Sequence, residues 1–70
     1  MKRYVTEIIL DLERKAKAAK PEEFKRYAMH DRLFAESARC DLGFITSLEA
    51  VKRVVNIYER FQEDPELLMQ

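Results

Sequence analysis

Cysteine, glycine and proline are scarce in this chain of 70 residues, which holds one cysteine, one glycine, two prolines and no tryptophan. A single cysteine, Cys40, excludes an intramolecular disulfide, and a metal site would have to draw on one histidine and scattered carboxylates. A single glycine, Gly43, excludes most phosphate-binding loops and nucleophile elbows, which need glycines at fixed spacings. We therefore expect neither an enzyme nor a bound cofactor or metal on this chain alone.

The chain also has no net charge, because 13 basic residues balance 13 acidic ones. A neutral molecule exerts no long-range attraction on DNA, anionic lipid or acidic substrates. The balance is uneven, however, since residues 1–20 carry six basic and three acidic side chains, a net charge of +3. Only this first segment has the net positive charge that would favour contact with phosphate.

Long apolar runs are absent as well. The stretch near the start of the chain is interrupted by Glu7 and Asp11, so it is too short and too charged for a secretory signal or a membrane span. An isolated cysteine agrees with a reducing compartment. We therefore expect a cytoplasmic protein that makes no membrane contact.

The residues that dominate the chain are alanine, leucine, glutamate, lysine and arginine, which all favour helices. Potential helix breakers occur at Pro21, Gly43 and Pro65. We therefore expect an all-α fold, a helical hairpin or three-helix bundle, in a single domain over residues 1–70. The predicted elements are helices over about 2–19, 21–42 and 47–62 and a short C-terminal turn over 65–69.

Local signals define the ends of these helices. Pro21 suits a first helical position, where its missing amide hydrogen costs nothing. Gly43 is suited to the left-handed conformation that closes a helix, with Phe44 folding back onto it. Thr46 and Glu49 have the spacing of a capping box, in which each side chain bonds the other residue's amide.

A carboxylate in the helix expected over 21–42 is the most unusual feature of the pattern. Projected at about 100° per residue, Asp31 falls near the middle of a broad apolar face. The apolar members of this face are Phe24, Tyr27, Ala28, Phe34, Ala35, Ala38 and Leu42. A second, narrower stripe holds Met29, Leu33 and Cys40.

Burying an unpaired carboxylate costs several kcal/mol, so Asp31 should be paired, protonated or in contact with water. One interpretation is a salt bridge to a neighbouring helix. Another is a role in setting the register of a dimer or in receiving a basic residue of a partner. A catalytic role would require a second titratable group nearby, and the pattern places none. His30 lies about 100° away around the helix and is expected at the surface, and Cys40 is expected to be a packing residue.

The helices expected over 21–42 and 47–62 show more apolar surface than one short chain covers. A chain of this length also has a marginal core, which a second subunit often completes. We therefore expect a homodimer, and a non-enzymatic protein-interaction module such as a regulator, adaptor or inhibitor. The candidate partner contacts are Asp31, Tyr27, Phe34, Tyr4, Tyr58 and Phe61. The large aromatic residues, Phe44 among them, are otherwise expected mostly in the core.

Two alternatives remain open. The first is a nucleic-acid-binding regulator with a degenerate helix-turn-helix, although Arg39 and Glu49 stand where that motif has packing residues and the chain lacks a basic excess. The candidate contacts for nucleic acid are Arg14, Lys15, Lys17, Lys20, Lys52 and Arg53. The second alternative is an accessory subunit of an enzyme complex, in which Asp31 or His30 completes a site formed with another chain.

Overall fold

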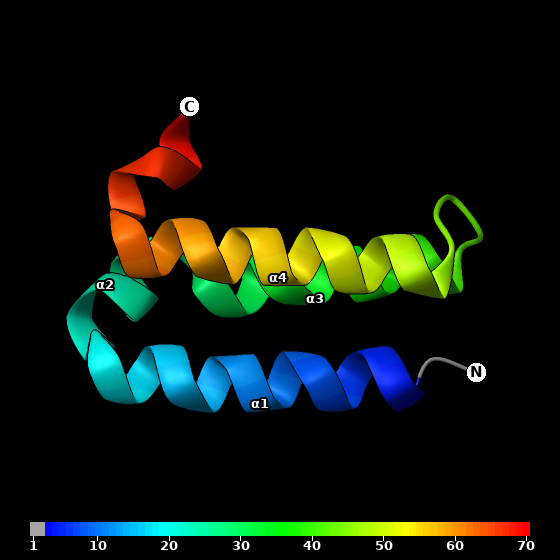
Figure 1. Cartoon of the computed structure of the whole chain (residues 1–70), viewed down its shortest axis with the longest axis horizontal. Helices are drawn as coiled ribbons and strands as arrows, with labels where there is room; N and C mark the ends of the chain where they lie inside the picture. Colours follow the sequence, from blue (N-terminus) through cyan, green and yellow to red (C-terminus); the bar gives the residue numbers. More distant parts are fainter. Residues whose placement is uncertain (1–2) are drawn as a thin grey trace.

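Helices account for nearly all of residues 3–70, the part of the chain that the computed structural model describes (Figure 1). They are α1 (Arg3–Ala19), α2 (Pro21–Arg26), α3 (Met29–Asp41), α4 (Ser47–Glu63) and a short 3-10 helix, η1 (Pro65–Met69). No strand occurs in these residues, so the predicted all-α class is confirmed. The predicted start of the first helix at residue 2 lies outside the described residues.

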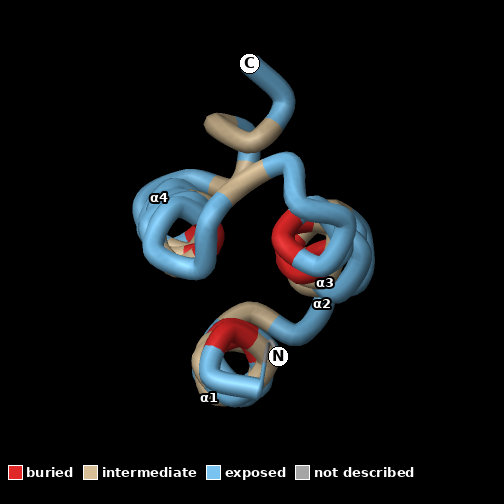
Figure 2. Tube along the Cα trace, turned by 90° about the vertical axis from the view of Figure 1, so that its right-hand side faces the viewer, coloured by how far each residue is buried: buried red, intermediate tan, exposed pale blue. Residues whose placement is uncertain are grey.

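Helices α1, α3 and α4 enclose a shared core. α1 and α4 run in the same direction and α3 runs in the opposite one (Figure 1). Seen along the bundle, the buried sides of the three helices face one another (Figure 2). The core residues are Val5, Ile9 and Ala16 of α1, Met29, Leu33 and Cys40 of α3, and Ala50, Val54 and Phe61 of α4.

The dimensions of the molecule are those of an ordinary small monomer. Its radius of gyration is 11.5 Å, close to the value of about 11 Å expected for a compact domain of this length. Its accessible surface is 4774 Å², and a folded monomer of this mass typically exposes roughly 4600 Å². The core is thus assembled from residues of one chain.

The single helix predicted over 21–42 is wrong, because the chain breaks into α2 and α3 at Tyr27 and Ala28. Ala28 has φ 52° and ψ 48°, in the left-handed region that residues with a side chain rarely adopt. A continuous helix would pair the Tyr27 carbonyl with the amide four residues later. Instead, the Tyr27 carbonyl accepts a 2.8 Å hydrogen bond from Nε of Arg32, which satisfies the group that the break exposes.

Core packing explains why the helix breaks here. Phe24 and Leu33 are nine residues apart, which in one continuous helix is about 900°, so they would point in opposite directions. In the structure both face the core: Leu33 is fully buried and Phe24 packs against the buried cluster. The break therefore brings both apolar faces to the same side, which compensates for the strained conformation at Ala28.

Helix signals in the segment between α3 and α4 agree with the predictions. Gly43 has φ 84°, and its amide donates to the Cys40 carbonyl at 3.1 Å. The following amide, of Phe44, donates to the Arg39 carbonyl at 2.9 Å, which completes a Schellman motif. The predicted capping box of Thr46 and Glu49 is present at the start of α4. This short connection reverses the direction of the chain between the end of α3 and the start of α4, which are both fixed by hydrogen bonds.

Candidate functional site

Several large apolar side chains are exposed at one end of the bundle. Leu42 follows α3 and is 72% exposed, Phe44 in the connection is 75% exposed, and Leu48 in the first turn of α4 is 64% exposed. The first turn of α1 lies at the same end (Figure 1), and there Tyr4 is 63% exposed. We call these four residues the apolar end. It is the candidate site, because four of the six large apolar side chains exposed in residues 3–70 belong to it.

The two helix caps give the apolar end its shape. In a Schellman motif the residue after the glycine usually packs back on its own helix, and the sequence predicts this for Phe44. The prediction that Phe44 belongs to the core is wrong, because the residue it would pack against, five positions earlier, is the charged Arg39 rather than an apolar one, and Phe44 stays exposed. Ile45 packs against the core instead. The backbone is thus fixed while the Phe44 ring projects outward.

A buried carboxylate ties α3 to α4 below the apolar end. Glu36 is only 5% exposed, and its Oε2 accepts a 2.9 Å hydrogen bond from Nη1 of Arg39. Its Oε1 accepts a 2.5 Å bond from Nε of Arg53, whose Nη2 lies 3.4 Å from Oε2. The hydrogen bond to Glu36, and then the attraction of its charge, raise the pKa of Arg53 above its already high usual value. The side chains of Arg39 and Arg53 are about half exposed, so the two ion pairs connect the buried Glu36 carboxylate to the surface.

Other charged groups surround the apolar end. The backbone amide of Thr46, and then its hydroxyl, hold the pKa of the Glu49 carboxyl below its usual value. Asp41 and Lys52 are exposed, and within the described part of the chain neither forms an ion pair. Together with Arg39, these residues give the end charges of both signs around its apolar centre.

Asp31 does not occupy the place that the sequence predicts. It is exposed, two residues from both Met29 and Leu33 and so about 200° around α3 from the core. Ala35 and Ala38 do share its face, but Ala35 is only half-buried and Ala38 is exposed, and the narrower predicted stripe is the one that forms the core. The prediction of Asp31 at the centre of a packed apolar face is wrong. Asp31 instead lies in the first turn of α3, where a carboxylate suits the helix dipole.

The other candidate partner contacts are scattered. Tyr27, Phe34 and Tyr58 are half-buried, and the last two pack against the core. Phe61 is fully buried, so it is a core residue and not part of the surface. Of the aromatic candidates, only Tyr4 is exposed, and it alone reaches the apolar end.

The candidate nucleic-acid contacts are mostly engaged within the chain. Arg14 and Lys15 form ion pairs with Asp11, and their hydrogen bonds and charges, Lys15 first, lower the pKa of that carboxyl. Lys20 Nζ donates to the carbonyls of Phe61 at 3.2 Å and Gln62 at 2.9 Å, near the end of α4. Arg53 is bonded to Glu36, as above. Lys17 and Lys52 are exposed.

These basic residues do not form one surface. The basic candidates of α1 lie in its second half, near the α2 end of the bundle. Lys52 and Arg53 lie nearer the opposite end (Figure 1). Helices α3 and α4 lie antiparallel, side by side, whereas the two helices of a helix-turn-helix cross at about 90–120°. The geometry of this hairpin differs from that motif.

His30 lies at the surface, whereas Cys40 packs in the core. His30 Nδ1 lies 2.6 Å from Oε2 of Glu13 and so joins α3 to α1, and its ring lies 4.7 Å from that of Phe34. Cys40 is buried, with its Sγ 3.7 Å from Oγ of Ser47. Across residues 3–70, no three His, Cys, Asp or Glu side chains are placed to hold a metal ion.

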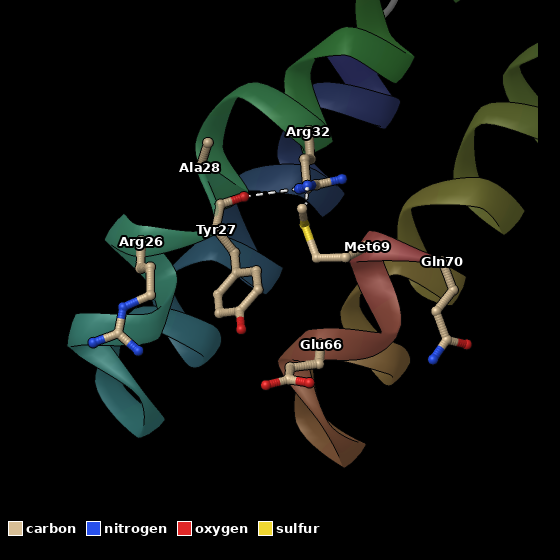
Figure 3. A pocket seen from close by; sticks show the side chains of 7 residues that line it. All are labelled: Arg26, Tyr27, Ala28, Arg32, Glu66, Met69 and Gln70. Carbon is tan, nitrogen blue, oxygen red and sulfur yellow. Dashed lines mark hydrogen bonds between the residues drawn. The ribbon is translucent and has the colours of Figure 1, made fainter.

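A hollow of about 600 Å³ lies between the α2–α3 junction and η1 (Figure 3). Its lining residues are Arg26, Tyr27, Ala28, Arg32, Glu66, Met69 and Gln70. Arg32 reaches across it from α3, because besides the Tyr27 carbonyl it contacts the Leu68 carbonyl at 3.3 Å. The guanidinium of Arg32 therefore holds η1 against α3.

Two parts of this arrangement were missed from the sequence. Glu36 falls on the stripe of Met29, Leu33 and Cys40, at three- and four-residue spacings, and this was a usable signal for a buried carboxylate. For the exposure of Leu42 and Leu48 no such signal exists, because both residues suit a core equally well.

Comparisons with known proteins do not assign the chain to a family. No family model, no curated protein and no solved structure matches it. Within residues 3–70, no helix has the length and apolar character needed to cross a membrane.

Proposed function

We propose that this chain is a non-enzymatic protein-interaction module, a small regulator, adaptor or inhibitor that acts by covering a partner's surface with its apolar end. The observation that carries the proposal is the exposure of Tyr4, Leu42, Phe44 and Leu48 at the same end of the bundle. Exposed apolar patches of a few hundred Å² on small proteins often mark binding sites. Aromatic residues such as Phe44 and Tyr4 are also the type that contributes most to protein interfaces.

The rigidity of the apolar end supports the same function. The Phe44 backbone is fixed by its bond to the Arg39 carbonyl, and the first turn of α4 is fixed by Thr46 and Glu49. A surface that is already ordered loses less conformational entropy on binding, so more of the apolar burial is expressed as affinity. Leu42 directly follows α3 and Leu48 lies in the first turn of α4, so both residues are next to these fixed helix ends.

Site-specific photo-cross-linking in cells that express the chain tests the proposal. The photoreactive residue p-benzoylphenylalanine replaces Phe44 in one variant and Leu10 in a control, since Leu10 is an exposed apolar residue outside the apolar end. We expect discrete protein adducts from position 44 only. Adducts of equal yield from both positions, or none from position 44, would contradict the proposal.

A further inference from the structure

We propose that the partner of the apolar end is a second copy of this chain, bound through a two-fold symmetric contact. The inference rests on the function proposed above, because it assigns a partner to the same surface. Three observations support it: the apolar area at the end, the balance of its charges, and the position of Asp41.

The apolar area suits a weak dimer. From their exposed fractions and typical side-chain areas, Tyr4, Leu42, Phe44 and Leu48 present roughly 400–500 Å². A stable interface buries about 800 Å² on each partner, and weak ones bury less. With the charged residues around it, the apolar end reaches the lower part of this range. The dissociation constant of the dimer should therefore be on the order of tens of micromolar, and the fold of each copy should be unchanged.

Charge complementarity favours a second copy of the chain over a partner whose surface is strongly acidic or strongly basic. In a two-fold contact each pairing occurs twice, because residue i meets residue j and j meets i. The apolar end is flanked by two acidic residues, Asp41 and Glu49, and two basic ones, Arg39 and Lys52. A strongly acidic or basic partner would meet like charges on one side of the patch. A second copy supplies charges of both signs, and the proposed contact places Asp41 of each copy opposite Lys52 of the other, two residues that form no ion pair within residues 3–70.

Asp41 is the residue that this contact explains best. It is the last residue of α3, where the negative end of the helix dipole disfavours a carboxylate. No ion pair within the described residues compensates for that position. Lys52 is exposed one turn after Leu48 and likewise has no ion-pair partner there. In the symmetric dimer, Asp41 of each copy pairs with Lys52 of the other.

Sedimentation velocity on the purified full chain, from about 1 µM to about 500 µM, measures the association. We expect a monomer at the lowest concentration and a dimer at the highest. Phe44→Asp should raise the dissociation constant at least tenfold, whereas the matched control Leu10→Asp should leave it unchanged. Equal effects of the two substitutions would overturn the location of the contact.

Charge reversal tests the pairing itself. Asp41→Lys or Lys52→Asp alone should raise the dissociation constant about tenfold, because like charges then face each other twice. The double variant should restore it. Asp41→Lys should also raise the thermal stability of the monomer, since a cation suits the end of α3; a substitution that merely damaged the fold would lower it. Failure of the double variant to recover association would overturn the proposed pairing.

The two proposals fail separately. A chain that stays monomeric up to about 500 µM would overturn the second copy as partner. If position 44 nevertheless cross-links to a different protein, the proposed interaction function stands without the dimer. Adducts at position 44 that have twice the mass of the chain support both proposals.

Discussion

Ala28 is the only residue other than glycine with a positive φ within residues 3–70. Left-handed backbone costs a residue with a side chain roughly 1–2 kcal/mol, and glycine escapes this cost. Glycine at the same position loses more conformational entropy on folding, about 0.4–1 kcal/mol. The two terms have opposite signs, and the steric one is larger.

Replacing Ala28 by glycine should therefore stabilise the fold. We expect Ala28→Gly to raise the free energy of unfolding by about 0.5–1 kcal/mol in urea denaturation. The control is Ala38→Gly, at an exposed helical position of α3, which should lower it by about 1 kcal/mol. Equal losses for both variants would show that Ala28 is not strained.

The ion pairs of Glu36 join a buried carboxylate to two arginine side chains that are about half exposed. The side chain of Glu36 is only 7% exposed, while Arg39 and Arg53 are 46% and 51% exposed. An arginine that loses its partner is therefore still hydrated. A carboxylate that loses a partner remains buried, which is the costly case.

Removal of the arginines should accordingly damage the protein more than removal of the carboxylate. We expect Arg53→Met to lower the free energy of unfolding most, because it deletes two hydrogen bonds to Glu36. Arg39→Met, which deletes one, should follow, and Glu36→Met should have the smallest effect. The measurement is urea denaturation at pH 7. If Glu36→Met were the most destabilising of the three, the carboxylate itself would be the stabilising group.

At the scale of elements, the capping box of α4 is the clearest local device. Thr46 Oγ1 accepts from the Glu49 amide at 3.1 Å, and Glu49 Oε1 accepts from the Thr46 amide at 2.9 Å. The pKa of Glu49 is lowered by these bonds. A carboxyl whose folded-state pKa is lowered stabilises the protein above its unfolded-state pKa, and this contribution disappears as the pH falls through the folded-state value.

The stability of variants at Glu49 should therefore depend on pH. Glutamine also serves in a capping box but carries no charge. We expect the original protein to be more stable than Glu49→Gln at pH 7, and the difference to shrink once the pH falls below about 4. Glu49→Ala should be less stable than Glu49→Gln at both values, because it also loses the hydrogen bond. Thermal melts from pH 7 to pH 3 measure this, and a constant difference between the original protein and Glu49→Gln would contradict it.

Some features of the helices could be predicted from the sequence, and others could not. The all-α class, the cap at Gly43 and the capping box at Thr46 follow from neighbouring residues, and all three are present. The break at Ala28 has no local signal, because only the need to turn Phe24 and Leu33 to the same core produces it. Asp31 was misplaced for a related reason: α3 has two apolar stripes, and only the packing of α1 and α4 decides which of them is buried.

The candidate site was predicted less well than the fold. Tyr4 was expected as a partner contact and does reach the apolar end, whereas Phe61 fills the core. Phe44 was expected in the core, because an apolar residue at its position usually folds back on the helix. Its exposure depends on Arg39 at the facing position, and Arg39 is held by Glu36. Such a chain of side-chain contacts is a property of the folded molecule.

For the whole molecule, the question is whether one chain is stable without a second copy. Its radius of gyration and surface are those of a monomer, and its core is assembled from α1, α3 and α4 of the same chain. A dimer through the apolar end would then add to a fold that is already complete. In an obligate dimer, by contrast, the stability of the fold depends on protein concentration.

Two substitutions distinguish these cases. Phe44→Ser removes an exposed ring and should shift the melting temperature by less than about 4 °C, as expected for a surface change of about 0.5 kcal/mol. Leu33→Ala leaves a cavity in the core and should cost about 2–5 kcal/mol, which lowers the melting temperature by at least about 10 °C in a domain of this size. Circular dichroism at about 5 µM, where the proposed dimer is mostly dissociated, measures both. If Phe44→Ser instead unfolded the chain at this concentration, the apolar end would be part of the stability of the fold, and one chain would not be enough.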